Sequence, residues 1–284
     1  MAYDLSNFQL TPGGPVYSIQ DQYIDNLIKN FPEDNPYIHN AIPRNVSIQK
    51  YFDDGTLYDR IYSGTFEDLF IGDWWNAGYG GVNMIFRIAG FDTLIGTGDT
   101  QLTTHHAVIV PDESFELCMM NKADTTVGGY KGSYANKTVI GDPATSGGTS
   151  TVNQKLYSTF GRHLLTTREL LTTSVDADAT AVRSAGGYGS SNGWEWTSCQ
   201  AILMSEVELL GTHVAGSSAL DDGVSNMQLP LFRTMPYTIN YHSYNMWLRS
   251  ISHNGYFCMC GENHYLATGL ATRQCWVRPR FVID

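Results

Sequence analysis

From Thr65 onward, the apolar residues of this chain occur in short runs bounded by residues that favour turns. The clearest runs are residues 82–88 (VNMIFRI) and residues 107–110 (AVIV), in a region rich in glycine and aromatic residues. Runs of this length and composition are typical of buried β-strands. We therefore expect an α+β fold with a twisted, mostly antiparallel sheet, two or more helices and long loops.

The first 64 residues have a different character. They hold five of the ten prolines, which disfavour regular structure. The exception is residues 19–31, which predict an amphipathic helix because apolar side chains recur at every fourth position, at Ile19, Tyr23, Leu27 and Phe31. We expect residues 1–64 to be an N-terminal arm for attachment or oligomerisation. Deleting this arm is expected to leave residues 65–284 folded but monomeric.

Between the two apolar runs and the C-terminus, the chain alternates between polar excursions and short regular segments. Residues 128–150 and 184–193 are dense in Gly, Ser and Thr and are expected to be surface excursions. A helix is expected to begin near Val152, with an apolar face marked loosely by Leu156, Phe160, Leu164 and Leu171. Ser205, with Glu208 three residues later, predicts a capping box at the start of a short helix.

The balance of charged residues disfavours some partners. Lys and Arg number 17 against 28 Asp and Glu, which gives a formal net charge of −11. So acidic a chain is not attracted unspecifically to nucleic acid or to an anionic membrane. The N-terminus lacks the pattern of a signal peptide, and no later stretch approaches the ~20 apolar residues of a membrane helix. We expect a soluble protein, made in a cytoplasm and not inserted into a membrane.

The cysteines do not form a disulfide framework. They number five and are widely spread, at Cys118, Cys199, Cys258, Cys260 and Cys275, so we expect reduced thiols. Cys258 and Cys260, with Cys275 and His253 or His264, could form a zinc knuckle. On a strand, however, the single intervening residue places the two thiols on one face about 7 Å apart. This spacing argues against a disulfide, and unbonded thiols are the favoured interpretation over a metal site.

The pair His105-His106, near Asp92, Asp99 and Asp112, is the first candidate for a metal site. Adjacent strand residues point to opposite faces, so the two imidazoles could hardly share one ion. We expect one histidine in the core and the other on the surface.

Motifs of common enzyme classes are absent from the sequence. It contains no G-x-S-x-G elbow, no phosphate-binding P-loop and no H-E-x-x-H pair. The carboxylate pairs Asp53-Asp54 and Asp221-Asp222 lie in turn-like surroundings, which favours solvated loops over an acid/base pair. We therefore expect no catalytic residues, no bound metal and no cofactor.

Two motifs near the C-terminus flank a 26-residue stretch: residues 244–250 (YNMWLRS) and residues 277–282 (VRPRFV). Four further segments precede them, at residues 86–89 (FRIA), 105–112 (HHAVIVPD), 203–208 (LMSEVE) and 228–232 (QLPLF). In this order, the segments resemble a domain family of formally unknown function from phages and prophages of gut Firmicutes. That family has the C-type-lectin-like fold shared by formylglycine-generating enzymes.

The resemblance covers about residues 65–284 and implies a C-type-lectin-like, ligand-binding domain over them. Trp247 and Leu248 would pack in the core, while Arg249 and Arg278, the latter followed by Pro279, would make buried polar contacts between strands. Some members of the family are targets of diversity-generating retroelements, which mutate adenines in the segment between the two motifs. The enzymatic relatives need a cysteine pair that has no counterpart here, so their oxidase activity is not expected to carry over.

The resemblance makes residues 251–276 the ligand-facing segment. Tyr, Trp and Arg, which dominate binding hot spots, are frequent in it, although strand alternation places about half of such residues in the core. We expect the exposed members to form one contiguous patch. The expected ligand-binding residues are Ser252, His253, Asn254, Tyr256, Glu262, Asn263, His264, Tyr265, Thr268, Arg273, Gln274 and Trp276.

Binding is expected to need no calcium. Calcium takes about six to eight oxygen ligands, usually from several carboxylates. Glu262 is the single carboxylate in residues 251–276, so a calcium ion would need distant acids such as Asp221 and Asp222. We expect aromatic stacking, Arg273 and shape to give selectivity instead.

Together, these features favour a non-enzymatic phage virion protein that displays a variable surface for host-cell attachment. Its expected partners are a bacterial host surface protein or glycan, other virion proteins and further copies of itself. A trimer is favoured, because several weak sites displayed together gain avidity. One alternative is a purely structural head or tail decoration protein without a ligand, and another is a metal- or cysteine-dependent enzyme.

Overall fold

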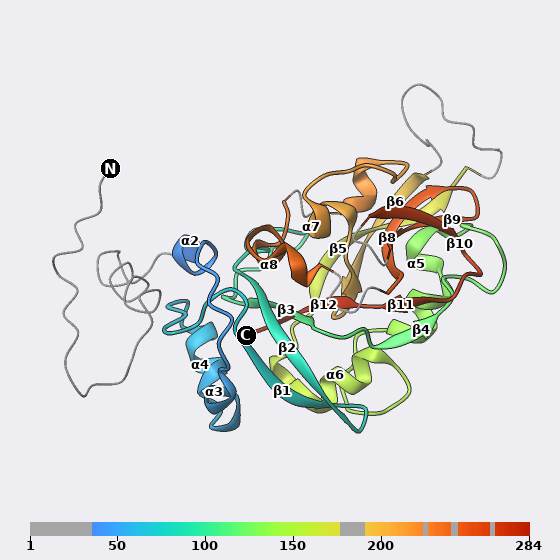
Figure 1. The fold of residues 1–284 in the computed structure, drawn as a ribbon. Helices are drawn as coiled ribbons and strands as arrows, with labels where there is room; N and C mark the ends of the chain where they lie inside the picture. Colours follow the sequence, from blue (N-terminus) through green and yellow to red (C-terminus); the bar gives the residue numbers. More distant parts are fainter. Residues whose placement is uncertain (1–35, 177–190, 224–226, 240–243, 262–264) are drawn as a thin grey trace, which may run out of the picture.

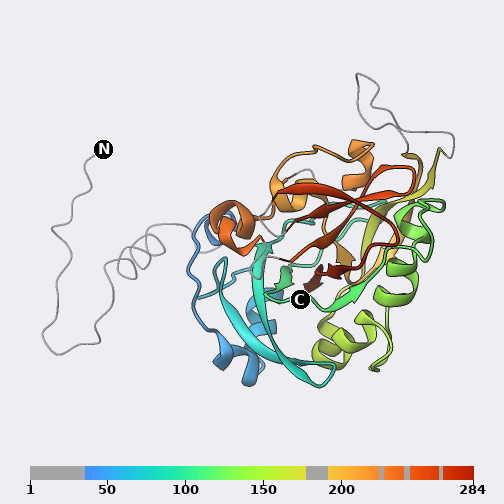
Figure 2. The same ribbon diagram turned by 45° about the vertical axis from the view of Figure 1, so that its right-hand side comes forward.

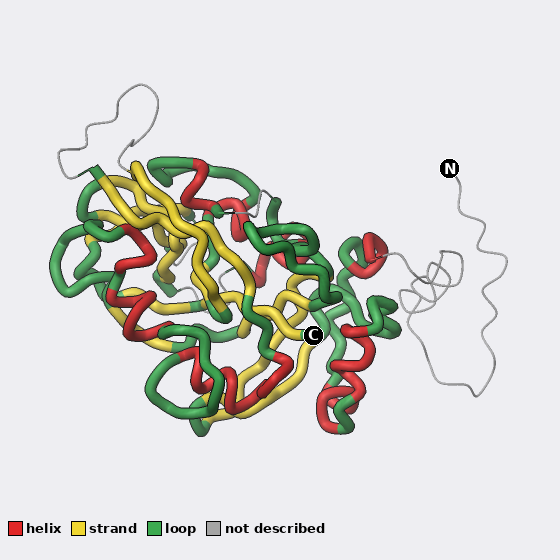
Figure 3. Tube along the Cα trace, turned by 180° about the vertical axis from the view of Figure 1, so that it is seen from behind, coloured by secondary structure: helices red, strands yellow, loops and turns green. Residues whose placement is uncertain are grey.

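The computed structural model describes residues 36–176, 191–223, 227–239, 244–261 and 265–284. Within these residues the protein is α+β, with mostly antiparallel sheets and few helices, as the short apolar runs predict. The helix expected over residues 19–31 lies outside the described residues. Strands occupy the centre of the molecule, and the helices lie around them (Figure 3).

The first sheet has the strand order β1-β2-β3-β12-β7, and every neighbouring pair in it is antiparallel. Its strands are β1 (Trp74–Tyr79), β2 (Val82–Phe91), β3 (Ala107–Pro111), β12 (Pro279–Ile283) and β7 (Ile202–Leu203). The apolar runs at residues 82–88 and 107–110 lie in β2 and β3, which confirms their prediction as strands.

The second sheet has the order β10-β9-β8-β11-β4, and only its β8–β11 pair is parallel. Its strands are β10 (Leu266–Leu270), β9 (Tyr256–Cys260), β8 (Met246–His253), β11 (Cys275–Val277) and β4 (Glu116–Cys118). A separate hairpin pairs β5 (Thr167–Val175) with β6 (Ser191–Cys199). Figures 1 and 2 show β8, β9 and β10 at the opposite end of the molecule from β1.

The helical segments are short. They are α2 (Pro36–His39), α3 (Gln49–Asp53), α4 (Thr56–Tyr62), α5 (Gly129–Gly132), η1 (Ala135–Ile140), α6 (Val152–Phe160), η2 (Gly161–His163), α7 (Glu206–Leu210), η3 (Ala219–Asp222), α8 (Pro230–Thr234) and η4 (Pro236–Thr238). The helix expected near Val152 is confirmed as α6. The capping box is also confirmed, because Ser205 Oγ accepts from the Glu208 amide while Glu208 accepts from the Ser205 amide.

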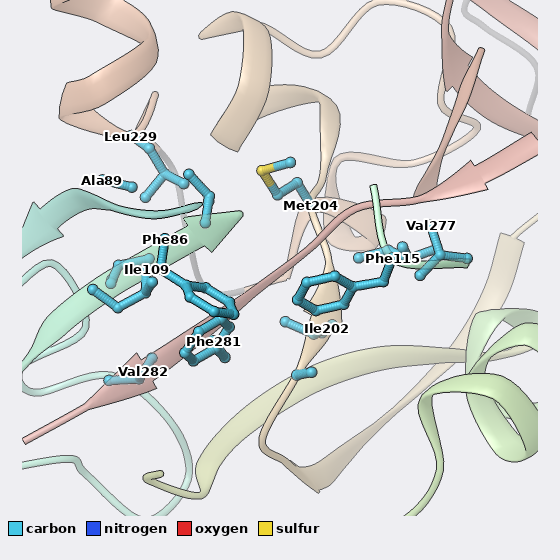
Figure 4. Packing of buried hydrophobic residues seen from close by; sticks show 14 of the residues in the cluster. Phe86, Ala89, Ile109, Phe115, Ile202, Met204, Leu229, Val277, Phe281 and Val282 are labelled. Atoms are coloured by element: carbon cyan, nitrogen blue, oxygen red, sulfur yellow. The ribbon is translucent and has the colours of Figure 1, made fainter. Parts of the chain in front are cut away.

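The core lies between the first sheet and the elements that pack on it (Figure 4). Phe86 of β2 meets Phe281 of β12 edge to face, with ring centroids 5.7 Å apart. Phe160 at the end of α6 packs on Phe281 at 5.1 Å. Ile109 of β3 and Ile202 of β7 are fully buried beside these rings. Complete burial of each such side chain stabilises the folded state by about 1.5–3 kcal/mol. This cluster therefore holds β2, β3, β12 and α6 together.

A single residue, Arg278, separates β11 from β12 and so connects the two sheets. Its side chain is buried, and its guanidinium donates to backbone carbonyls: Nε to Pro111 at 2.7 Å, and Nη1 to Thr238 and Ile239 at 2.8 Å each. Burial among these groups lowers the pKa of Arg278 to about 10. The arginine thus fixes the crossing point by hydrogen bonds to two separate segments, the end of β3 and residues 238–239.

A buried ionic network joins both sheets to the β5–β6 hairpin. Glu208 on α7 accepts from Arg249 Nη1 of β8 at 2.9 Å and from Arg280 Nε of β12 at 2.6 Å. Arg280 also donates to Glu169 of β5 at 2.9 Å. All four side chains are excluded from solvent. In such surroundings, an ion that loses its partner is strongly destabilising.

Residues 36–64 pack on the same core as the rest of the described chain. Ile48, Leu57 and Ile61 are fully buried within the main hydrophobic cluster. Arg44 forms an ion pair with the buried Asp73 at 2.6 Å. α3 and α4 lie beside β1 in Figure 1, and Phe52 of α3 stacks on Trp75 of β1. The packing shows no separation at Thr65, where the sequence suggests the end of an arm.

Two expectations about the middle of the chain are wrong. Residues 128–140 are not a surface excursion but form α5 and η1, where the buried Tyr130 hydroxyl accepts from the Leu203 amide at 3.2 Å. Helix α5 packs closely on β5, and glycine at position 129 allows this approach. A Cβ there would lie 2.2 Å from the Thr172 carbonyl oxygen. The apolar face of α6 ends at Phe160, and Leu171 lies on β5 instead.

Replacing Arg280 by Met tests the buried network. The Arg280→Met change leaves Glu169 buried without its cation, so we expect the free energy of unfolding to fall by about 3–5 kcal/mol. Denaturant unfolding followed by circular dichroism measures it. The matched control is Arg168→Met, which breaks the partly exposed pair with Asp99 and should cost less than ~1 kcal/mol. Equal losses in the two variants would contradict the assigned role of the network.

Truncation tests the packing of residues 36–64. Compared with a chain that lacks residues 1–35, a chain that lacks residues 1–64 also loses Ile48, Leu57 and Ile61 from the core. Each of these side chains contributes about 1.5–3 kcal/mol of burial, so we expect the shorter chain to lose its cooperative thermal transition. Identical melting of the two truncated chains would instead favour an independent arm.

Candidate functional site

The pairing register of the second sheet places one row of side chains across all five strands. Residues paired across neighbouring strands point to the same face. Leu266 of β10 pairs with Cys260 of β9, which pairs with Met246 of β8. Met246 pairs with Trp276 of β11, and Trp276 pairs with Leu117 of β4. These side chains therefore share one face of the sheet.

The middle of this row is buried, and its two ends are accessible. Cys260 and Met246 are excluded from solvent, whereas Leu117 is 52% exposed and Leu266 and Trp276 are half-buried. Accessible side chains near the row fall into two groups. The β10-edge group consists of His253, Tyr256, Tyr265, Thr268 and Leu270, and the β11-edge group consists of Leu117, Tyr244 and Trp276.

In the β10-edge group, aromatic side chains lie at both ends of an edge strand. The His253 and Tyr256 rings stack with centroids 4.2 Å apart, and Leu270 pairs with Tyr256 across β9 and β10. Tyr265, which is 50% exposed, lies over Gly261 so closely that a Cβ there would approach the Tyr265 ring to 2.6 Å. Glycine at position 261 therefore permits this placement of the Tyr265 ring.

In the β11-edge group, two aromatic rings form a stacked pair. The Tyr244 and Trp276 centroids are 5.2 Å apart, and the ring planes differ by 27°. The Trp276 amide donates to the Asn245 carbonyl at 2.9 Å, which holds β11 beside the start of β8. Leu117 adjoins Trp276 through the β4–β11 pair. The group thus presents an apolar surface at the edge opposite β10.

The structure distributes the expected ligand-binding residues unevenly. Tyr265, Arg273 and Gln274 are exposed. His253, Asn254, Tyr256, Thr268 and Trp276 are half-buried. Ser252 is fully buried, with its hydroxyl 3.0 Å from His253 Nδ1, so it is placed to orient that ring and not to meet a ligand. Glu262, Asn263 and His264 lie outside the described residues.

Strand β9 is buried on both faces, which strand alternation alone does not predict. Phe257, Cys258, Met259 and Cys260 are all excluded from solvent. Phe257 packs against the Trp247 ring on one face, while on the other face Cys258 is fully buried, with its pKa raised first by burial and then by Glu206 of α7. Elements α7 and η3, which carry Glu206, Asp221 and Asp222, therefore lie against a face that the sequence pattern leaves open. Many side chains of residues 251–276 are therefore buried and support the fold, so they cannot contact a ligand.

The motif residues that flank this segment are buried. Trp247, Leu248, Arg249, Arg278 and Pro279 are all excluded from solvent. The Trp247 indole donates to the Cys118 carbonyl at 3.0 Å, which ties β8 to β4 across the sheet. The first motif thus anchors the start of the segment, and Arg278 anchors its end.

All five cysteines are free and buried. Burial raises the pKa of Cys118 and Cys199 to about 12, and that of Cys260 and Cys275 to about 11. The pKa of Cys258 is also raised, first by burial and then by the neighbouring Glu206. Because thiolates are the reactive species, these thiols offer no ready nucleophile at neutral pH.

The two adjacent histidines separate as expected. His106 is fully buried, and its Nε2 accepts from the Leu94 amide at 3.2 Å. His105 is accessible, with Nδ1 2.7 Å from Asp92 Oδ2. The prediction of one core and one surface histidine is confirmed.

Asp221 and Asp222 are not a solvated loop, which corrects the expectation from the sequence. Both are buried. Asp221 accepts from Thr172 Oγ1 at 2.6 Å, Ser191 Oγ at 2.8 Å and Trp194 Nε1 at 2.9 Å. Asp222 accepts from His213 Nδ1 at 2.7 Å. The sequence correctly predicts a turn at these residues. The turn, however, packs inward against β5, β6 and β8.

His213 also lies near a second buried carboxylate, that of Glu206, at 3.7 Å. Glu206, His213 and Asp222 have ligand atoms that all lie within 4.8 Å of one another. The sequence analysis missed this cluster because its members are spread over 17 residues (206–222) without a recognised motif.

Comparison with known proteins finds no family model, no curated protein and no solved structure that matches the chain. Within the described residues, none of the helices has the length and apolar character needed to cross a bilayer.

Buried histidines give a testable pH dependence. Burial lowers the pKa of both His39 and His106 below the usual 6.5. Below pH ~6.5 the unfolded chain binds protons at these positions before the folded chain does, so stability should decline as pH falls toward the folded-state pKa values. Denaturant unfolding between pH 7.5 and about 5 measures the decline. His106→Gln and His39→Gln should each reduce its slope, and an unchanged slope in both variants would refute the assignment.

Proposed function

We propose that this protein is a phage virion-associated recognition protein that binds a bacterial surface protein or glycan through its second sheet. The observation that carries the proposal is the division of residues 251–276 into buried scaffold and accessible aromatic or polar side chains. Tyrosine, tryptophan and arginine among the accessible ones are the residue types that dominate binding hot spots. The resemblance to a phage and prophage domain family supplies the biological setting.

A C-type-lectin-like architecture is part of the proposal. The α+β class, the mostly antiparallel sheets and the short helices are compatible with it. The W-L-R-S motif falls in β8, and the V-R-P motif falls where β11 passes into β12. Trp247, Leu248, Arg249 and Arg278 are buried, which is compatible with the roles that the resemblance implies for them.

Diversification, if it acts on this segment, would be tolerated only at some positions. Gly255 has a φ of +81°, and a Cβ there would lie 3.0 Å from the Asp124 carbonyl oxygen. A Cβ at Gly269 would lie 3.0 Å from the Trp247 ring. Changes at these glycines strain the scaffold, whereas changes at Tyr265 or Arg273 alter only the accessible surface. The proposal therefore assigns variability to the β10-edge group, Arg273 and Gln274.

Oligomerisation belongs to the same proposal. A trimer would display three copies of each edge group, so weak single contacts would act together on a cell surface. The two edge groups also permit different roles, one toward the host and one toward a neighbouring virion protein. The rival function, structural decoration without a ligand, would use the same surfaces only for contacts within the virion.

Cell binding by matched variants tests the proposal. Fluorescently labelled protein is titrated onto a panel of gut Firmicutes strains, and bound fluorescence is measured. We expect saturable binding to some strains. The double change Tyr256→Ala and Tyr265→Ala should weaken it by roughly 700-fold, because hot-spot side chains each contribute on the order of 2 kcal/mol.

Tyr62→Ala is the matched control, since it also removes an exposed tyrosine, on α4. It should bind as the wild type does, and all variants should keep the wild-type melting temperature. Trp276→Ala reports separately on the β11-edge group. If no strain binds, while the protein binds purified phage particles that lack it, structural decoration replaces recognition.

A further inference from the structure

Strand β10 forms one margin of the second sheet, and its outer side has no neighbouring strand in the described part of the chain. Figure 1 shows β10 next to β9, at the end of the molecule away from β1. The two strands pair without a register shift. The sequence of β10, LATGL, contains neither a charged residue nor a proline. Charges, prolines and bulges usually keep an edge strand from pairing with another chain, and β10 has none of them.

Two hydrogen bonds at the ends of the β9–β10 pair fix the direction of the backbone groups between them. The Gly261 amide donates to the Tyr265 carbonyl, and the Ala271 amide donates to the Gly255 carbonyl, each at 2.8 Å. In an antiparallel pair, residues that bond across the pair alternate with residues whose amide and carbonyl point away. The odd-numbered residues of β10 therefore bond to β9. The even-numbered residues direct their amides and carbonyls outward: Leu266, Thr268 and Leu270.

Most of these outward groups have no hydrogen-bond partner within the described residues. The Leu270 carbonyl accepts from the Arg273 amide at 2.8 Å. The three amides, and the carbonyls of Leu266 and Thr268, remain unpaired. A donor and an acceptor on every second residue repeat at about 6.6–6.8 Å, which another extended polypeptide matches. The edge can therefore accept a further strand.

The margins of the other described sheets are covered, short or interrupted. The segment before α3 covers β1, because the Trp74 amide donates to the Val46 carbonyl and the Ile48 amide donates to the Trp74 carbonyl. Strand β7 has two residues, and β4 has three. Strand β6 is longer, but its pairing with β5 shifts register twice, and it carries Glu195. Among the described strands, β10 is therefore the unprotected edge.

Side chains beside this edge can select the incoming segment. Leu266, Thr268 and Leu270 project to one face, on which Leu270 pairs with Tyr256. The exposed Arg273 lies just beyond the end of β10 and forms no ion pair with the described residues. These groups are complemented by an extended segment that has apolar or β-branched residues at alternate positions and an acidic residue near Arg273.

We propose that β10 binds an extended segment of a host surface protein, which adds to the second sheet as an antiparallel strand. Main-chain hydrogen bonds supply affinity, and the alternate side chains supply selectivity. The inference rests on the proposed recognition function and narrows its partner from a protein or glycan to a protein. A second copy of this chain is disfavoured as the occupant, because each copy carries a formal net charge of −11.

Replacement of Thr268 separates backbone recognition from side-chain recognition. Thr268→Pro removes an outward amide but no bond to β9, and edge strands tolerate proline at such positions. The matched control, Thr268→Ala, shortens the side chain but keeps the amide. The probe is a set of peptides selected on wild-type protein from a library of displayed random peptides. We expect Thr268→Pro to weaken their binding by roughly 30-fold or more, and Thr268→Ala by less than ~3-fold.

Hydrogen exchange tests the same point without a substitution. In wild-type protein, we expect the Leu266 and Thr268 amides to exchange at least about 10-fold more slowly once a selected peptide is bound. The Ala267 amide, which faces β9, should be protected in both states. Circular dichroism and melting temperature check that both Thr268 variants fold. Equal affinities of the two variants, or no added protection at Leu266 and Thr268, would overturn the proposal.

Cells separate this inference from the proposed function. On strains that bind wild-type protein, binding is measured before and after the cells are treated with proteinase K. We expect the treatment and Thr268→Pro each to remove most of the binding. Binding that survives both indicates a glycan and overturns strand addition, while recognition stands. If no strain binds, recognition and the host partner both fail, and the peptides alone report whether β10 adds a strand. A dimer on light scattering that Thr268→Pro dissociates would instead identify a second copy as the occupant.

Discussion

The carboxylate of Glu208 is the point at which the fold is held together. It receives Arg249 from the second sheet and Arg280 from the first, and Arg280 extends the link to Glu169 on the β5–β6 hairpin. Because Glu208 also completes the capping box of α7, the helix cannot shift without breaking both ionic contacts. Glu206, two residues earlier in the same turn, belongs to the buried cluster with His213 and Asp222. The position of α7 therefore governs both the joint between the sheets and the layer that packs on the second sheet beside the candidate surface.

Local patterns predict local structure in this chain well. The apolar runs of β2 and β3 and the Ser205–Glu208 capping box depend on neighbouring residues alone, and all are confirmed. The burial of Tyr130 and Asp221 depends on partners 73 and 49 residues away, Leu203 and Thr172, which no local pattern reports. The glycine-rich composition of residues 128–140 predicts an exposed segment. In the structure, glycine at position 129 instead allows α5 to pack closely on β5.

The candidate surface was only partly predictable for the same reason. An exposed Tyr265 and a buried Trp247 follow from the motifs and from strand alternation. The burial of both faces of β9, and with it Cys258, requires α7, η3 and the loop between them to pack against the second sheet. Likewise, the division into two edge groups follows from the parallel pairing of β8 with β11, which composition does not specify. The Glu206, His213 and Asp222 cluster exists only once that loop is in place.

The position of β11 and β12 has a consequence for how the protein is made. Residues 275–283 supply an interior strand to each five-stranded sheet, β11 between β8 and β4 and β12 between β3 and β7. Synthesis proceeds from the N-terminus at about 5–20 residues per second. While more than 150 residues are added (119–274), β3 therefore has one edge unpaired, because β12 is missing, and β4 lacks its partner β11. Their unpaired edges make the nascent chain vulnerable to association until residues 275–283 have been synthesised and have paired.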